Sequence, residues 1–220
     1  MVPPPTSVAF RGKNAFSLVE MAAVTAILAT LMTAGIGLFN GTGARSCEAG
    51  TDLLAGLIEQ ARTTAITSRT HVVLAIAEPG DLPADDGRCR IGLFKMEEWP
   101  EPAAVPLVLK GVLLNRWQTL DTGVALIGGD VDGVANPLDQ PQVTITYGRT
   151  RNLGVQVHAI AFNSRGGLHY PPGSNPVAIR LAEGGYRGGK AAANRRGEQK
   201  TITGNRLKIG RVTARPYRTD

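Results

Sequence analysis

Glu20 is the residue whose type and position most strongly suggest chemistry, because it is the only charge in an apolar run from Phe16 to Phe39. The run has about 24 residues, enough at about 1.5 Å per residue to cross a hydrocarbon core of about 30 Å. A carboxylate at the centre of a membrane helix costs roughly 2.5–3.5 kcal/mol, and less near an end. Glu20 is therefore expected to pair with a cation, the alternative being a side chain that reaches the headgroups.

The remaining acidic and histidine residues do not form a catalytic pattern. The adjacent pairs Asp85–Asp86 and Glu97–Glu98 would point to opposite faces of a strand, which suits acid–base catalysis poorly. His71, His158 and His169 have no neighbours at zinc-ligand spacing, so structural or surface roles are expected. Acidic loops leave calcium as an open alternative, although no EF-hand pattern is present. The candidate oxygen donors are Asp81, Asp85 and Asp86, or Asp130 and Asp132. The chain is expected to be no enzyme and to need no metal or cofactor.

The chain has two cysteines, Cys47 and Cys89. They could form a disulfide if most of the chain lies outside the cytoplasm, and they would otherwise remain free thiols. The sequence leaves both states open.

Positive charge is concentrated near the carboxyl end of the chain, whose formal net charge is +6. This basic segment could bind DNA or another polyanion. The other interpretation is a solvated surface that meets the acidic half, residues 81–139, of a neighbouring subunit. The candidate polyanion contacts are Arg195, Arg196, Lys200, Arg206, Lys208 and Arg211.

A polar, proline-rich and basic segment, residues 1–15, precedes the apolar run. A secretory signal peptide would have a shorter apolar stretch, of about 7–15 residues, and no acid inside it. A plain signal anchor explains Arg11 and Lys13 as cytoplasmic flanks but does not explain Glu20. In a third interpretation the chain is cut after Ala15, and the apolar run becomes the new amino terminus.

Residues 11–20, RGKNAFSLVE, resemble the prepilin signature of type IV pilins and type II secretion pseudopilins. The resemblance implies cleavage between Ala15 and Phe16 by a prepilin peptidase, followed by methylation of the Phe16 amine. It also implies that Glu20 directs filament assembly by neutralising the amine of an adjacent subunit. Ala15 departs from the family, which usually has glycine before the cut.

Two further segments are similar to the H-type minor pseudopilins. They are residues 60–69, QARTTAITSR, and residues 160–167, IAFNSRGG. The resemblance implies a minor pilin or pseudopilin, a structural subunit of a type IV pilus or a type II secretion pseudopilus that functions in protein secretion. Its partners would be other pilin subunits and the inner membrane, which it would cross once with an extracytoplasmic, periplasmic head. The alternative function is a membrane-anchored extracytoplasmic binding module whose basic segment binds nucleic acid.

The expected organisation is a leader at 1–15, a transmembrane and assembly helix at 16–39, a helical continuation at 40–69 after a glycine-rich break, and a β-rich head at 70–220. The predicted fold class is α+β, with a long N-terminal hydrophobic transmembrane helix that extends into the globular domain and packs on an antiparallel sheet.

Apolar residues at helical spacing predict that one stripe of the continuation is buried. These residues are Leu53, Leu54, Leu57, Ile58, Ala61, Ala65 and Ile66. Strands are predicted at 71–77, 90–96, 105–114, 124–127, 143–147, 155–162, 177–181 and 201–213. Residues 183–189 are predicted to be a flexible loop. Residues 200–210 are predicted to be either a terminal hairpin with a Gly-Asn turn or a paired strand.

Overall fold

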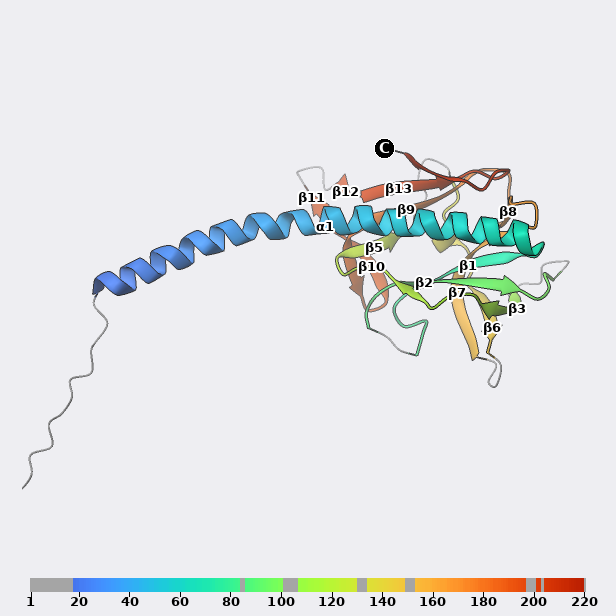
Figure 1. Ribbon diagram of the computed structural model, residues 1–220, viewed down its shortest axis with the longest axis horizontal. Helices are drawn as coiled ribbons and strands as arrows, with labels where there is room; N and C mark the ends of the chain where they lie inside the picture. Colours follow the sequence, from blue (N-terminus) through green and yellow to red (C-terminus); the bar gives the residue numbers. More distant parts are fainter. Residues whose placement is uncertain are drawn as a thin grey trace, which may run out of the picture. The chain divides into compact units, whose positions relative to one another are not determined.

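Helix α1 (Leu18–Ser68) is the first element of the computed structural model and is followed by strands (Figure 1). The structure describes residues 18–83, 86–100, 107–129, 134–148, 153–196, 201–202 and 204–219, with the side chains at 29–42, 153, 195–196 and 201 left out. The chain divides into two compact units, Met1–Gly41 and Thr42–Asp220. Helix α1 begins in the first unit and ends in the second.

The glycine-rich segment near residue 41 does not interrupt helix α1, although a break was predicted there. A glycine inside a helix costs only about 1 kcal/mol relative to alanine, far less than a proline. At Gly43 the missing side chain also has a packing role, since a Cβ atom would lie 3.3 Å from Glu183 Cδ. The helix ends near Arg69, whose positive φ of 52° lies in the left-handed region that commonly terminates helices.

The described strands of the second unit form two large sheets and one small one. The first sheet contains β1 (Val72–Ala77), β2 (Arg90–Met96), β3 (Val108–Leu113), β4 (Gln118–Thr119), β6 (Val143–Tyr147), β7 (Leu153–Phe162) and β8 (Leu168–Tyr170). The second contains β5 (Val124–Ile127), β9 (Val177–Arg187), β10 (Lys190–Ala193), β13 (Gly204–Ile209) and β14 (Pro216–Thr219). Strands β11 (Arg195–Arg196) and β12 (Thr201–Ile202) pair with each other, and a 3-10 helix, η1, covers Pro137–Asp139.

The first sheet closes on itself. Its order is β1-β2-β3-β6-β7-β8, and β1 also pairs with β7. The β3–β6 pairing is parallel, whereas the other pairings in this sheet are antiparallel. Strand β1 is therefore hydrogen-bonded on both edges, and all six of its residues are buried.

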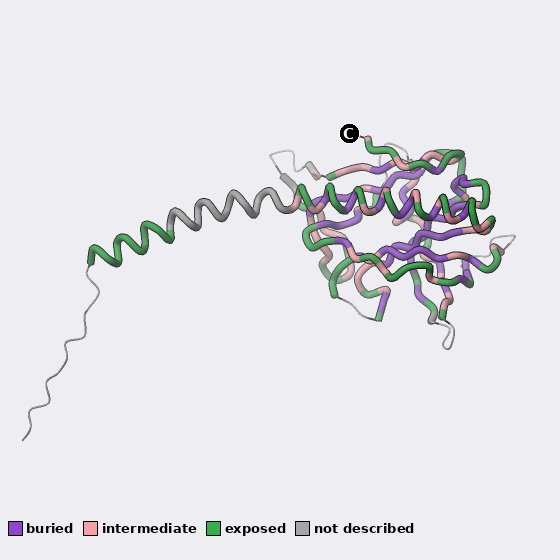
Figure 2. The backbone as a smooth tube through the Cα atoms, viewed as in Figure 1, coloured by how far each residue is buried: buried purple, intermediate pink, exposed green. Residues whose placement is uncertain are grey.

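Two apolar clusters form the core, and Figure 2 shows the buried strands beside helix α1. Side chains of a strand alternate between its two faces, so β1 contributes Leu74 to one cluster and Val73 to the other. The cluster on the helix side contains Leu54 and Ile58 of α1 together with residues of both large sheets. The other cluster fills the inside of the closed sheet, with Phe94 among its largest side chains.

The predicted fold class is wrong. The described chain is mainly β, with two large sheets and one small one where a single antiparallel sheet was predicted, and the first sheet includes a parallel pair. Among the described residues, no helix is both long and apolar enough to cross a membrane. This finding overturns the predicted transmembrane helix and membrane assignment, and with them the single-pass inner-membrane location.

One local prediction is also wrong, and another is resolved between its two alternatives. The predicted loop at 183–189 is largely strand, because β9 continues to Arg187 and pairs with β10. Glycine permits this pairing, since a Cβ atom on Gly184 would lie 2.2 Å from the Ala192 carbonyl oxygen. Of the two alternatives for residues 200–210, the paired strand is confirmed: β13 begins at Gly204, where a hairpin turn was the other possibility, and pairs with β9 and β14.

Candidate functional site

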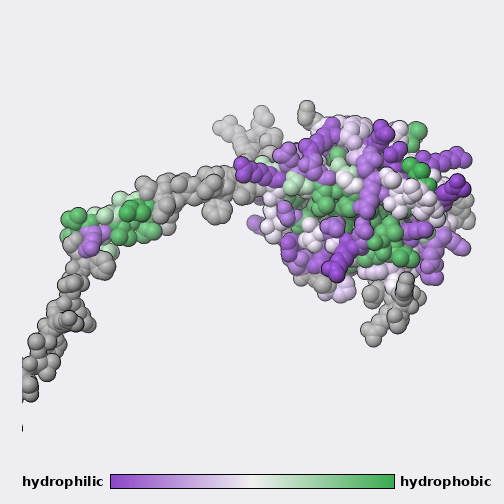
Figure 3. Space-filling model, viewed as in Figure 1, coloured by the Kyte–Doolittle hydropathy of each residue, from purple (hydrophilic) through white to green (hydrophobic). Residues whose placement is uncertain are grey.

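The first described turns of α1 carry apolar side chains around one carboxylate. The large apolar residues are highly exposed, with Leu18 at 88% and Val19 at 78% of their full area. Met21, Val24, Ile27 and Leu28 are also exposed, as is Glu20. Figure 3 shows this part of the helix mostly in the hydrophobic colour. Exposed apolar surface of this kind is typical of an interaction site.

Two polar groups lie within this apolar segment and differ in their chemistry. The Thr25 hydroxyl donates to the carbonyl oxygens of Met21 at 2.9 Å and Ala22 at 3.0 Å, so the helix itself satisfies it. Glu20 lies in the first turn of the helix. Its negative charge there interacts favourably with the positive end of the helix dipole, which stabilises the helix by about 0.3–1 kcal/mol. An ionised carboxylate that is covered by apolar neighbours needs a cation to offset its desolvation.

Most of the predicted prepilin signature, residues 11–17, lies outside the described residues. Ala15 and Phe16, the predicted cleavage and methylation positions, lie outside the described residues. Of the signature, the structure therefore describes only the segment from Leu18 to Glu20.

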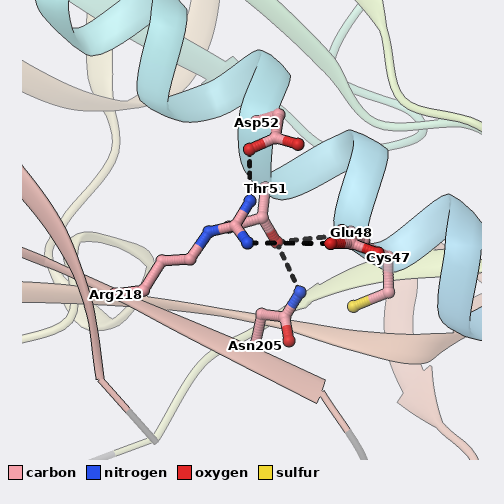
Figure 4. Close-up of polar contacts among 6 residues, drawn as sticks. All are labelled: Cys47, Glu48, Thr51, Asp52, Asn205 and Arg218. Carbon is pink, nitrogen blue, oxygen red and sulfur yellow. Dashed lines mark hydrogen bonds and ion pairs between the residues drawn. The ribbon is translucent and has the colours of Figure 1, made fainter.

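A polar junction joins the carboxyl-terminal strands to helix α1 (Figure 4). Thr51 is fully buried; its hydroxyl donates to the Cys47 carbonyl oxygen at 2.7 Å and accepts from Asn205 Nδ2 at 3.1 Å. Arg218 of β14 forms an ion pair with Asp52, and its Nη1 lies 3.9 Å from Glu48 Oε1. These contacts fix β13 and β14 against the helix.

The two cysteines do not form a disulfide; both are buried free thiols. The Cys47 thiol donates to the Leu181 carbonyl oxygen at 3.4 Å, and burial raises its pKa. Burial also raises the pKa of Cys89, to about 12, although a hydrogen bond with the Tyr186 hydroxyl opposes the shift. Neither sulfur is a thiolate at neutral pH, so neither is prepared for nucleophilic or metal chemistry.

The predicted polyanion residues do not assemble into one described basic surface. Lys200 lies outside the described residues, and the side chains of Arg195 and Arg196 are not described. Arg206 and Lys208 of β13 are partly buried. The guanidinium of Arg211 is occupied by hydrogen bonds to the backbone. It donates to three carbonyl oxygens, those of Pro171, Pro172 (3.3 Å) and Asn175 (2.6 Å). Its pKa is lowered by burial.

The histidines include a grouping that sequence reasoning missed. His71 and His169 have ring centroids 4.6 Å apart, whereas His158 is buried in β7. Their separation of nearly a hundred residues gave no local signal, and only strand pairing brings them together. Within the described part of the chain, no three His, Cys, Asp or Glu side chains are grouped as metal ligands; Asp85 and two other acidic candidates for calcium, Asp130 and Asp132, lie outside it.

Comparison with known protein families, with curated proteins and with solved structures finds no match.

Proposed function

We propose that this protein is a minor structural subunit of a filament of the type IV pilus or type II secretion pseudopilus kind. A prepilin peptidase would remove residues 1–15, and the protein would enter the filament through the amino-terminal part of α1. The observation that supports this most directly is the exposed apolar surface of residues 18–28 around the single carboxylate of Glu20. This carboxylate stands at the fifth position after the predicted cut, where the resemblance places the assembly residue.

Helix packing supplies the physical reason for the assembly. Apolar side chains around a helix are stabilised when neighbouring helices cover them, by about 25 cal/mol for each Å² removed from water. Covering them also removes water from Glu20, and the amine that cleavage creates on a neighbouring Phe16 can neutralise it. A charge pair between subunits would then fix the axial register of the helices, because only one register pairs the two groups.

The second unit gives the helix a firm attachment to the folded domain. From Cys47 onward α1 contributes buried side chains to the helix-side core, among them Leu54, Ile58 and Ala61. Arg218 and Asn205 hold the same part of the helix from β14 and β13. The domain would thus be carried on the helix as the filament forms.

Replacement of Glu20 tests the proposal. The full-length protein and the Glu20→Gln and Glu20→Ala variants would be expressed in the native host, and the chain would be quantified in sheared filaments and in whole cells. We expect normal cellular amounts and a loss of about tenfold or more from filaments for both variants. Glu59→Gln is the matched control, because it removes a carboxylate from the same helix but in the second unit.

Mass spectrometry of the amino terminus separates processing from assembly. The mature chain is expected to begin with N-methylated Phe16 in the wild type and in all three variants. A chain that begins with Met1, or a Glu20→Ala variant found in filaments at the wild-type level, would refute the proposal.

A further inference from the structure

Three apolar side chains are exposed along one strand of the first sheet. Val108 and Val112 of β3 each keep 56% of their full exposure, and Leu114, directly after the strand, is also exposed. Side chains of a strand alternate between its two faces, so the two valines point outward whereas Leu109 packs inside the closed sheet. The three exposed residues share one side of the sheet and form an apolar surface, which we call the β3 face, rather than scattered single residues.

Acidic residues border one end of the β3 face. Val108 lines a surface pocket of about 410 Å³ together with Trp99, Glu97, Glu98 and Lys110. Lys110 Nζ lies 2.9 Å from Glu97 Oε2 and offsets one of the two carboxylates. The pocket therefore combines apolar walls with a net negative charge among these lining residues.

The turn between β13 and β14, residues 210–215, is apolar and basic. Val212 keeps 86% of its full exposure, the highest value among the large apolar residues described in the second unit. Arg215 is exposed in the same turn, and Tyr217 and Arg218 are exposed in β14. In the view of Figure 1, strands β3 and β13 lie on opposite sides of helix α1. The turn is therefore available to another molecule, as is the β3 face.

Hydrogen bonds hold this turn in one shape. The Gly210 N–H donates to the Arg215 carbonyl oxygen at 3.3 Å and closes the turn. The Arg211 guanidinium donates to three backbone carbonyl oxygens outside the turn, and the Arg211 carbonyl oxygen accepts from the Leu168 N–H at 2.8 Å. Ala214 is fully buried. A turn that is fixed in advance loses little conformational freedom when it binds.

We propose that the β13–β14 turn of one copy of this chain docks on the β3 face of a second copy, with Val212 in the pocket beside Val108 and Arg215 near Glu98. The occupant is identified by complementarity, because the pocket is acidic, the turn is basic and both expose apolar side chains. The contact joins different surfaces of the two copies, so it is heterologous and can repeat as an open chain. It uses only the second unit and does not depend on the proposed role of Glu20.

Cysteine cross-linking between copies tests the contact, because both native thiols are buried. Purified full-length Val108→Cys and Val212→Cys chains would be mixed and oxidised, and the linked peptides identified by mass spectrometry. A disulfide needs Cα atoms about 4.4–6.8 Å apart, so the 108–212 link should exceed links between identical chains about threefold or more. Val112→Cys is the matched control, since Val112 is equally exposed on the same strand but does not line the pocket. It should link to Val212→Cys about threefold less than Val108→Cys does.

Exchange of the charges separates specific docking from random collision. Glu98→Lys in the Val108→Cys chain, or Arg215→Glu in the Val212→Cys chain, should lower the link about threefold, and mixing the two altered chains should restore it. All of these positions are exposed, so the chains should fold. Glu20→Ala should leave the link unchanged, so the contact and the filament role fail separately. Equal links to the pocket position and the control position, or a charge exchange that restores nothing, would overturn the proposal and leave the β3 face to a different partner.

Discussion

Arg218, in the last strand, forms an ion pair with Asp52 of helix α1, 166 residues earlier in the chain. The pair lies on the surface, where the Arg218 side chain keeps 46% and the Asp52 side chain 68% of their full exposure. It joins the end of the chain to the helix that we propose carries the protein into a filament. Its contribution to stability, however, is limited by solvent.

Removing this ion pair should have a small effect on folding. Because exposed pairs contribute roughly 0.2–1 kcal/mol, Arg218→Ala should lower the free energy of unfolding by no more than about that amount. High salt should reduce the difference between the two proteins. Urea denaturation at low and high salt measures both effects. The charge-swapped double variant, Asp52→Arg with Arg218→Asp, should be more stable than either single variant; equal stabilities would show that the pair does not form.

Replacing Thr51 should lower stability more than removing the ion pair. Thr51 is fully buried, and its hydroxyl both donates a hydrogen bond to Cys47 and accepts one from Asn205. Thr51→Val keeps the shape but removes the hydroxyl that accepts the Asn205 amide, which leaves a partly buried donor unsatisfied. We expect a loss of about 1–3 kcal/mol in the free energy of unfolding. Thr51→Ser retains the hydroxyl and is the matched control; it should retain more stability than Thr51→Val, and the reverse order would contradict the role of the hydrogen bonds.

Cys89 should make stability fall in alkaline solution. Its pKa is raised from 9.0 to about 12 by burial, so between these values the unfolded chain loses a proton that the native thiol retains. The stabilising contribution is complete below about pH 9 and is lost as pH rises toward 12, at up to about 1.4 kcal/mol per pH unit.

Unfolding free energies at pH 7.5 and pH 10 check this, with Cys89→Ala as the comparison. Between the two pH values, the free energy of unfolding should fall less for Cys89→Ala than for the wild type. If wild type and variant fall equally, the thiol is not the group responsible.

Gly56 offers a stabilising substitution in α1. A Cβ atom there would have no heavy atom within 4 Å, and alanine is favoured over glycine in a helix interior by about 1 kcal/mol. Gly56→Ala should therefore raise the thermal unfolding temperature. Gly50→Ala is the matched comparison, since its Cβ would lie 3.3 Å from Leu181 Cδ2 and part of the gain would be lost to crowding. A lower melting temperature for Gly56→Ala would show that this turn is not an exposed regular helix.

Periodicity made part of the fold predictable. Alternating or continuous apolar runs indicated the strands near β1, β2, β6 and β7, and the helical stripe indicated that Leu54, Leu57, Ile58, Ala61 and Ala65 are buried. Ile66 belongs to the same stripe but is exposed, because it lies near the helix end. These signals are local, since each depends on residues a few positions apart.

Long-range pairing could not be predicted in the same way. The β1–β7 pairing that closes the first sheet joins residues far apart in the chain, as does the grouping of His71 with His169. Gly184 appeared to indicate a loop, yet it is glycine because β10 approaches so closely. At the candidate assembly site the sequence provided Glu20 and its position, whereas the extent of exposed apolar surface required the structure.

Strand β1 lies between the two apolar clusters and contributes to both, because its alternate side chains enter opposite clusters. It is also hydrogen-bonded on both edges, to β2 and to β7. Neither core can open without breaking this strand, so the two should melt as one cooperative unit. The amide protons of β1 would then exchange with solvent only when the whole domain unfolds. Their exchange rate would report the global stability of the domain, whatever happens at the amino-terminal end of α1.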